Sequence, residues 1–422
     1  MTSQFSPQPR YRQSHPRRTW AKVATAALSG RTTHSEEDVA ALEKRVAELM
    51  GIDHGICVSQ GRTGIYLALC HLIEPGQNVV LSPYTFHEVI NMVLCAGGRP
   101  IFADIEADSY SIAASEVERL IDNDTGAVIA THLFGISCDI ESISKICRDR
   151  GVPLIEDAAQ CFGARINGRH LGTFGDAAVF SFSRVKNVSS LYGGMVVTQD
   201  DALQNHIRSA LKPLPYESPT RLLGQALTSV AFDVMTADVL FQFVSFPLFR
   251  IDYLRNFNAL GRLVETERGP VAYRQIPKQY LKRMTPLQAR LVAEQLADVD
   301  RCSQARVAHA RSYHSGLSDI SDIRLPPLRE DGADIYLSLP VQVPDCEKLV
   351  KHMMRQGRDV RTRQYANAAD LPCFAEFARE CPNARTAAEC GFLLPTYPRY
   401  PESEVEKNIR VMREFFGRAT DT

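Results

Sequence analysis

The sequence predicts an α/β protein built on a mostly parallel sheet with helices on both faces. Short β-rich runs alternate with helical stretches from about residue 34 to residue 200, and most of these runs are apolar throughout. A strand that is apolar throughout is buried on both faces, as in a parallel sheet covered by helices. Ligands of such sheets bind beyond the carboxyl ends of the strands. The residues directly after the strands are therefore the candidates for chemistry.

The first predicted element is a helix with apolar residues at helical spacing from Val39 to Leu49. Ser35 is placed to cap its start and Gly51 to end it. The β-rich runs that follow lie at residues 54–59, 78–83, 100–105, 127–134, 153–157, 177–182 and 194–200. The helical stretches between them lie at residues 63–72, 115–121 and 140–148.

The sequence changes character after about Pro213. Residues 221–251 are apolar along nearly their whole length, but Asp233, Asp238 and Pro247 interrupt them. A transmembrane helix needs about 20 unbroken apolar residues, and carboxylates near its middle make spanning costly. We therefore expect a helical insertion that is buried or faces another subunit. Association with a membrane surface is the alternative interpretation of this stretch.

A second helical run begins at Thr285 and predicts one long amphipathic helix that extends to about Leu317. The remaining residues mix short strands with helices, as a smaller domain would. We predict an N-terminal arm at residues 1–33, a large domain at 34–275 and a small C-terminal domain at 276–422. The large domain includes the apolar insertion at about 213–275.

The composition sets limits on function and location. The formal net charge of -1 over 422 residues gives no global reason to bind nucleic acid, and no such partner is expected. The 11 cysteines show no zinc-site spacing, so we expect reduced thiols and no metal site. The first 20 residues lack the apolar region of a secretory signal, which favours a cytoplasmic protein. Their basic residues are interpreted as an arm rather than a mitochondrial transit peptide.

Two segments at predicted strand ends carry residues that are suited to catalysis. The first, IEDAAQCFGA at 155–164, ends a strand with the carboxylate of Asp157. The second, GDAAVFSFSRVKNVSSLYGGMVVT at 175–198, follows a strand with hydroxyls and with Lys186. The chain has no P-loop, no Gly-x-Gly-x-x-Gly helix start, no His-Glu-x-x-His and no Gly-x-Ser-x-Gly elbow.

Both segments resemble the signature of the DegT/DnrJ/EryC1/StrS family of pyridoxal-phosphate aminotransferases. Similar segments follow in the family's order at residues 58–69, 83–90, 97–112, 132–140, 283–296 and 381–398. The resemblance covers the chain from about Trp20 to the last helix, apart from residues 213–275. It implies fold type I of the pyridoxal-phosphate enzymes, the aspartate aminotransferase fold, and a homodimer with its active sites at the subunit interface.

The resemblance also implies roles for individual residues. Lys186 would hold pyridoxal phosphate covalently and then act as acid and base, and Asp157 would pair with the pyridinium nitrogen. The other implied contacts are Gln160 with the phenolic oxygen, Ser181 and Thr63 with the phosphate, and Phe86 with the ring face. Arg62 stands where family members usually have threonine, and we expect its guanidinium to bind the phosphate as well.

Each role has a plainer structural alternative. Lys186 could be a solvated surface charge, Asp157 a helix cap for residues 158–164, and Phe86 a core aromatic. His132 is interpreted as a buried, hydrogen-bonded histidine at a strand end rather than as a catalytic imidazole. Gly193 and Gly194 are expected to form a tight turn behind the lysine.

The activity that the resemblance implies is transfer of an amino group from glutamate or glutamine to a keto sugar or cyclitol. Such a reaction belongs to the biosynthesis of a cell-surface polysaccharide or a secondary metabolite. The chain departs from the family at Leu191 and Tyr192, where a Gly-Glu pair is usual, and it lacks an asparagine before Arg283. The alternatives are a dehydratase-like enzyme, whose known relatives lack the lysine, and a regulatory or interaction protein without catalysis.

Overall fold

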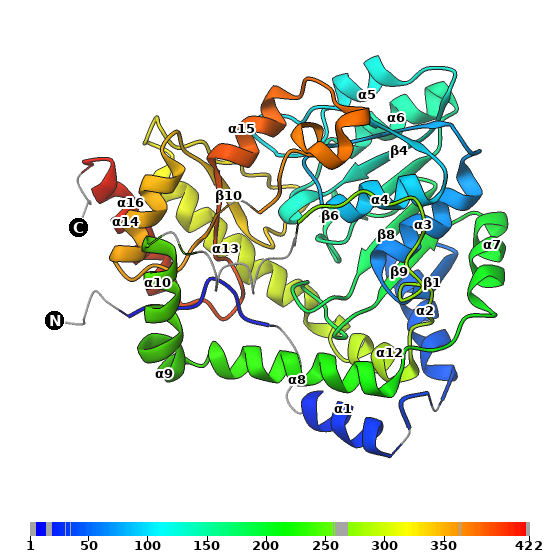
Figure 1. Ribbon diagram of the computed structural model, residues 1–422, viewed down its shortest axis with the longest axis horizontal. Coiled ribbons are helices and arrows are strands. Elements are labelled where there is room, and N and C mark those ends of the chain that lie inside the picture. Colours follow the sequence, from blue (N-terminus) through cyan, green and yellow to red (C-terminus); the bar gives the residue numbers. More distant parts are fainter. Residues whose placement is uncertain are drawn as a thin grey trace.

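The computed structural model describes residues 6–13, 19–29, 31–33, 35–255, 257, 269–362 and 364–418. Its centre is a seven-stranded sheet in the order β1-β9-β8-β5-β4-β2-β3 (Figure 1). The strands are β1 (His54–Val58), β2 (Asn78–Leu81), β3 (Arg99–Phe102), β4 (Thr125–Thr131), β5 (Leu154–Asp157), β8 (Ala177–Ser181) and β9 (Gly194–Thr198). All neighbours pair in parallel except β9, which runs antiparallel to both β1 and β8. The predicted mostly parallel sheet is confirmed.

Helices cover both faces of this sheet, which explains why its strands are apolar throughout. Val128 and Ile129 are neighbours on β4, yet they belong to different core clusters because successive side chains point to opposite faces. One face packs against α3 (Gly61–Leu72), α4 (His87–Cys95) and α7 (Asp201–Leu211). The other packs against α2 (Glu37–Met50), α5 (Ala114–Leu120) and α6 (Ile140–Arg150).

The start of the first predicted helix differs from the expectation. Glu36 occupies the cap position of α2, and Ser35 has a φ of 72° and provides only its carbonyl, which accepts the amide of Asp38 at 2.9 Å. The expected side-chain cap by Ser35 is wrong. Gly51 ends the helix as predicted, with a φ of 65° that glycine adopts without strain.

The long helix predicted from Thr285 is interrupted. Thr285 caps α12 (Pro286–Ala293), a 3-10 turn follows at Leu296–Asp298, and α13 (Val299–Leu317) begins after it. Gln295 lies at the break, where its side chain accepts the amide of Ser189 at 3.1 Å and donates to the carbonyl of Ser189 at 2.7 Å. The interruption thus turns a polar side chain toward the loop that carries Lys186.

The C-terminal part is built on a small antiparallel sheet of β10 (Leu339–Gln342), β12 (Gly391–Leu394) and β11 (Arg361–Thr362). Its helices include α14 (Cys346–Arg355), α15 (Pro382–Cys390) and α16 (Glu402–Phe415). The remaining described elements are α1 (Thr19–Leu28), β6 (Arg165–Ile166), β7 (Arg169–His170) and the 3-10 turns Arg31–Thr33, Leu133–Gly135, Ala368–Asp370 and Pro372–Phe377. The predicted domain boundaries stay predictions.

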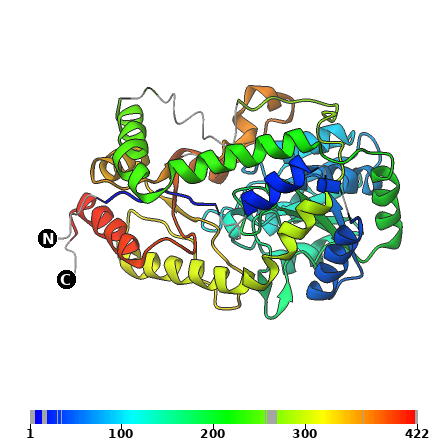
Figure 2. The same cartoon turned by 90° about the horizontal axis from the view of Figure 1, so that it is seen from below.

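The apolar stretch forms helices, as predicted, but only part of it is buried. It comprises α8 (Pro219–Met235), α9 (Asp238–Leu240), a π-helical turn at Phe241–Ser245 and α10 (Phe246–Leu254). Figure 2 shows α8 running along one side of the molecule toward α10, and α1 packs beside it. The axis bends by 67° between α8 and the segment that follows. Many of its large side chains are exposed, so the insertion is only partly buried within this chain, and the expectation that it faces another subunit stays a prediction.

Candidate active site

Lys186 lies in the loop that connects β8 to β9, at the carboxyl edge of the parallel strands. Its backbone amide donates to the carbonyl of Ser183 at 3.0 Å. Contacts from distant segments hold the loop in place: Asn187 donates to the carbonyl of Phe162 at 2.5 Å, and Tyr11 of the N-terminal arm donates to the carbonyl of Arg184 at 2.5 Å. Together with the hydrogen bonds between Gln295 and Ser189, these bonds fix the backbone on both sides of Lys186.

Asp157 is buried at the end of β5, the strand next to β8. Burial raises the pKa of Asp157, and the nearby Lys186 opposes that rise. Burial likewise lowers the pKa of Lys186 to about 8, with Asp157 opposing and Arg62 adding to the decrease. The two groups thus feel each other's charge, and both are shifted toward their neutral forms. Residues 158–164 contain no helix, so the alternative that Asp157 caps a helix is wrong.

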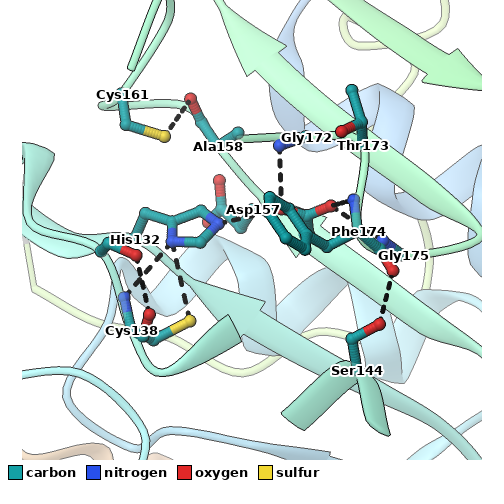
Figure 3. A network of polar contacts seen from close by, with 12 residues as sticks. His132, Cys138, Ser144, Asp157, Ala158, Cys161, Gly172, Thr173, Phe174 and Gly175 are labelled. Carbon is teal, nitrogen blue, oxygen red and sulfur yellow. Dashed lines mark hydrogen bonds and ion pairs between the residues drawn. The ribbon is translucent and has the colours of Figure 1, made fainter. Parts of the chain in front are cut away.

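A buried polar network supports the backbone around Asp157 (Figure 3). The Nε2 atom of His132 lies 3.2 Å from Glu156, and the amide of His132 donates to the carbonyl of Asp157 at 3.1 Å. Glu156 also accepts three backbone amides at 2.6–2.8 Å, from Gly172, Phe174 and Gly175. His132 is thus a buried, hydrogen-bonded histidine, as predicted. The role of Glu156 was missed, although a carboxylate inside an apolar strand signals a buried polar partner.

Hydroxyl groups gather where α3 begins. The hydroxyls of Ser59 and Thr63 lie 3.3 Å apart, and each donates to the carbonyl of Tyr280, at 2.7 and 3.2 Å respectively. Ser181 ends β8 directly beside this turn, because a Cβ placed on Gly61 would lie 3.2 Å from the Cβ of Ser181. The structure therefore brings the predicted phosphate ligands Thr63 and Ser181 to one helix N-terminus, which favours an anion. Ser59 was not predicted.

A close approach of two backbones fixes the position of this helix. A Cβ on Gly194, at the start of β9, would lie only 2.6 Å from the backbone nitrogen of Gly61. Only glycine fits there, so the strand after the lysine loop lies directly against the start of α3. Gly193 has a φ of 145°, in agreement with the turn predicted behind Lys186.

Arg62 is held by the predicted site residue Phe86 and by groups that sequence reasoning did not find. Its guanidinium lies over the rings of Phe86 and Tyr280, at 5.0 and 4.9 Å from their centroids, and 2.9 Å from the carboxylate of Glu88. Glu88 also accepts the hydroxyls of Tyr273 and Tyr280. Both tyrosines lie at the edge of the region without family resemblance, so no motif pointed to them. The predicted cofactor contacts of Arg62 and Phe86 stay predictions.

The carboxylate of Glu88 is strongly stabilised in this cluster. Burial alone would raise its pKa, but the contacts with His87 and Arg62 lower the pKa to about 2. Glu88 therefore remains charged at every pH at which the protein is expected to work. A permanent ion pair with Arg62 thus stands beside the lysine site.

Gln160 connects two parts of the chain. Its Oε1 atom accepts the amide of Phe134 at 3.1 Å, and its Nε2 atom donates to the hydroxyl of Tyr365 at 3.3 Å. Its predicted contact with the cofactor stays a prediction. In the part of the chain that the structure describes, no three His, Cys, Asp or Glu side chains form a group that could hold a metal ion.

The comparison with known protein families shows to which family the chain belongs. The sequence model of the DegT/DnrJ/EryC1/StrS aminotransferase family matches residues 15–215 and 253–413. The chain belongs to this family. The match omits residues 216–252, which hold α8, α9 and most of α10.

Individual relatives within the family carry different names. GDP-perosamine synthase of Vibrio cholerae is 38% identical over 162 residues, which are 38% of this chain and 44% of that protein, so the match spans less than half of the relative. A pleiotropic regulatory protein of Geobacillus stearothermophilus is 25% identical over 89% of this chain and 88% of its own. The crystal structure of S. venezuelae DesV in complex with a ketimine intermediate is 25% identical, covers 95% of each chain and has a TM-score of 0.71.

The donor groups at the strand ends fit pyridoxal phosphate. The cofactor needs an amine, an acid for its ring nitrogen and an anion site. The amine of Lys186 has a lowered pKa, the buried carboxylate of Asp157 has a raised one, and Thr63 and Ser181 meet at a helix N-terminus. A protonated ring nitrogen beside Asp157 would supply the positive charge that burial makes the carboxylate need.

Proposed function

We propose that this protein is a pyridoxal-phosphate-dependent aminotransferase that transfers an amino group from an amino acid to a keto group on a sugar or cyclitol. The observation that carries the proposal is the pairing of Lys186 with the buried Asp157 at the carboxyl edge of the sheet, in a chain of this family. A scaffold protein has no physical need for a half-buried lysine with a lowered pKa beside a buried carboxylate.

The residues of the site have distinct tasks under this proposal. Lys186 holds the cofactor covalently and afterwards carries the proton between carbon atoms, for which a pKa near 8 is well suited. Asp157 binds the ring nitrogen, so that the bound cofactor can accept electrons from the substrate carbon. The remaining contacts come from Gln160 at the phenolic oxygen, Phe86 at the ring, and Ser181, Thr63 and Arg62 at the phosphate.

The proposed acceptor is a nucleotide-linked keto sugar, and the proposed donor is glutamate or glutamine. The name of the Vibrio cholerae relative, GDP-perosamine synthase, supports a nucleotide-linked sugar. The proposed homodimer rests on the family resemblance. In that dimer the segment around Tyr280 and Arg283 would lie near the subunit interface.

A regulatory protein is the second candidate, because the relative that matches along nearly the whole chain is named a pleiotropic regulatory protein. A dehydratase-like reaction on a sugar is disfavoured by Lys186, which supplies the amine that dehydratases of this fold lack. All three functions allow cofactor binding. They differ in what happens when an amino donor is added.

The test is a half-reaction followed by product analysis. Purified protein loaded with pyridoxal phosphate is mixed with L-glutamate or L-glutamine, and its absorption spectrum is recorded. We expect the visible band to disappear with a donor, and the aminated protein to convert a nucleotide-linked keto sugar into an amino sugar detected by mass spectrometry. Lys186→Ala should do neither, whereas Lys44→Ala, which changes an exposed lysine, should behave as wild type.

Other outcomes separate the candidates. A band that no donor changes, with no product from any keto sugar, would favour the regulatory protein. A deoxygenated product without nitrogen would indicate dehydration.

A further inference from the structure

Exposed apolar side chains concentrate in the insertion. Phe243 is 75% exposed and Val239 is 73% exposed, values that are high for large apolar side chains. We call the following set the apolar face: Leu227, Val234, Met235, Val239, Phe243, Val244, Leu248 and Ile251, all of them more than two-fifths exposed. Soluble proteins rarely expose apolar side chains in such number on one short segment, and those that do use them for binding.

The helical spacing aligns these side chains within each part of the segment. Val239 and Phe243 are four residues apart, as are Val244 and Leu248, and Ile251 follows three residues later, so each set lies along one side of its helix. The opposite side faces the protein and buries Phe241, Phe246 and Asp252. The segment thus has one apolar side that packs against the protein and a second apolar side that faces outward.

No single described helix is long and apolar enough to cross a membrane. The bent pair formed by Pro219–Met235 and Asp238–Leu254 does reach that length and composition, with a bend of 67°. A bent apolar pair that is fastened to a globular domain on one side is suited to enter one leaflet of a bilayer rather than to span it.

The exposed charges of the segment are few. Asp252 is buried, Asp233 accepts the indole NH of Trp20 at 2.9 Å, and Asp238 is exposed but paired with Arg12. Arg255, by contrast, is exposed just beyond the end of α10. A cation at the border of an apolar face can pair with an anionic headgroup.

The insertion is also separate from the residues that carry the proposed chemistry. It coincides with residues 216–252, which the family match omits, and it contributes none of the side chains at Lys186, Asp157 or the phosphate end. The exposed apolar surface is therefore an addition to the family's architecture that catalysis by itself does not require.

We propose that the apolar face of α8, α9 and α10 binds the surface of an anionic lipid bilayer and inserts into the leaflet that it contacts. Hydrocarbon is favoured over a second copy of the chain, because the bent helix pair meets the length and hydropathy of membrane-inserted helices and Arg255 at its end is exposed and can contact lipid headgroups. The proposal is independent of the reaction that the protein catalyses.

The test is flotation of the full-length, cofactor-loaded protein with vesicles of phosphatidylcholine, alone or with one-quarter phosphatidylglycerol. We expect wild-type protein to float with both, and more strongly with the anionic vesicles. The double variant Phe243→Ser/Leu248→Ser should lower the partition coefficient at least about tenfold, since burial of a single large apolar side chain is worth about that much. The matched control Leu49→Ser/Val271→Ser changes two exposed apolar residues outside the apolar face and should float as wild type.

Light scattering and circular dichroism of the same proteins complete the test. Failure of the wild type to float with either vesicle, or equal flotation of the wild type and the Phe243/Leu248 variant, would overturn the proposal. If wild type does not float and the variant, still folded by circular dichroism, has half the mass of the wild type in solution, the apolar face is a subunit interface instead. A requirement for anionic lipid without any effect of the double variant would also contradict insertion.

Discussion

The chemistry of the site begins with two residues whose charges are shifted by burial. A lysine amine is normally protonated at neutral pH and is then no nucleophile. In this fold the pKa of Lys186 falls to about 8, so that roughly a tenth of the amine is neutral at pH 7, far more than for an ordinary lysine. Asp157 keeps this decrease from going further, and it places an acid where a ring nitrogen needs one.

Arg62 provides the sharpest residue-scale prediction. If its guanidinium binds the cofactor phosphate, Arg62→Ala should raise the dissociation constant of pyridoxal phosphate for the apoprotein at least about tenfold, as expected for the loss of one charge-assisted hydrogen bond. The dissociation constant of Arg62→Lys should lie between those of wild type and Arg62→Ala, because lysine keeps the positive charge but lacks the planar guanidinium. Equilibrium dialysis measures both. An unchanged constant for Arg62→Ala would show that Arg62 serves Glu88 alone.

Sequence reasoning at this scale found residues that belong to motifs and missed those that do not. Lys186, Asp157, Thr63 and Ser181 follow strands or begin a helix, and the structure brings them to one edge of the sheet. Glu88, Tyr273 and Tyr280 come from separate segments. Their meeting around Arg62 depends on the path of the chain after α10, which no local pattern specifies.

At the scale of elements, the lysine loop and β5 are fixed by buried polar groups rather than by apolar packing alone. Gln295 holds the loop from the break between α12 and α13, and Glu156 ties β5 to residues 172–175. The strands were predictable because burial on both faces demands continuous apolar runs. The break at Gln295 was not, because the apolar spacing continues through it and the contact with Ser189, which is distant in the sequence, has no local signal.

Glu156→Gln should destabilise the protein strongly. The change leaves His132 and three backbone amides without their carboxylate, and removal of one partner of a buried pair costs about 3 kcal/mol or more in the free energy of unfolding. Urea denaturation measures the loss. Glu141→Gln, which changes an exposed carboxylate at the start of α6, should stay within about 0.5 kcal/mol of wild type.

The pairing of His132 with Glu156 predicts that the stability of the protein depends on pH. Burial alone would lower the pKa of His132, but Cys138 and Glu156 raise it from 6.5 to about 10. A pKa that is higher in the folded protein adds stability that is complete below about pH 6.5 and is lost as the pH rises to about 10. The difference between wild type and Glu156→Gln should therefore shrink between pH 6 and pH 10. An equal difference at both values would contradict a charged His132.

At the scale of the whole molecule, the family architecture and the insertion have separate roles. The family match covers both sides of the insertion, and the sheet, the lysine loop and the C-terminal part all lie within it. Composition alone indicated a near-neutral protein without a nucleic-acid partner and said nothing about its chemistry. The order of motifs supplied the fold, whereas the outward orientation of the apolar face required the structure, because hydropathy does not tell which side of a helix the chain covers.

The central claim is that Lys186 holds pyridoxal phosphate covalently, and reduction with borohydride followed by peptide mass spectrometry tests it most directly. After reduction, wild-type protein should carry one cofactor group per chain on the peptide that contains Lys186, and its visible absorption band should be lost. Lys186→Ala should carry none, whereas Lys44→Ala should match wild type. Attachment to another lysine, or no attachment in wild-type protein that has been given the cofactor, would contradict the account.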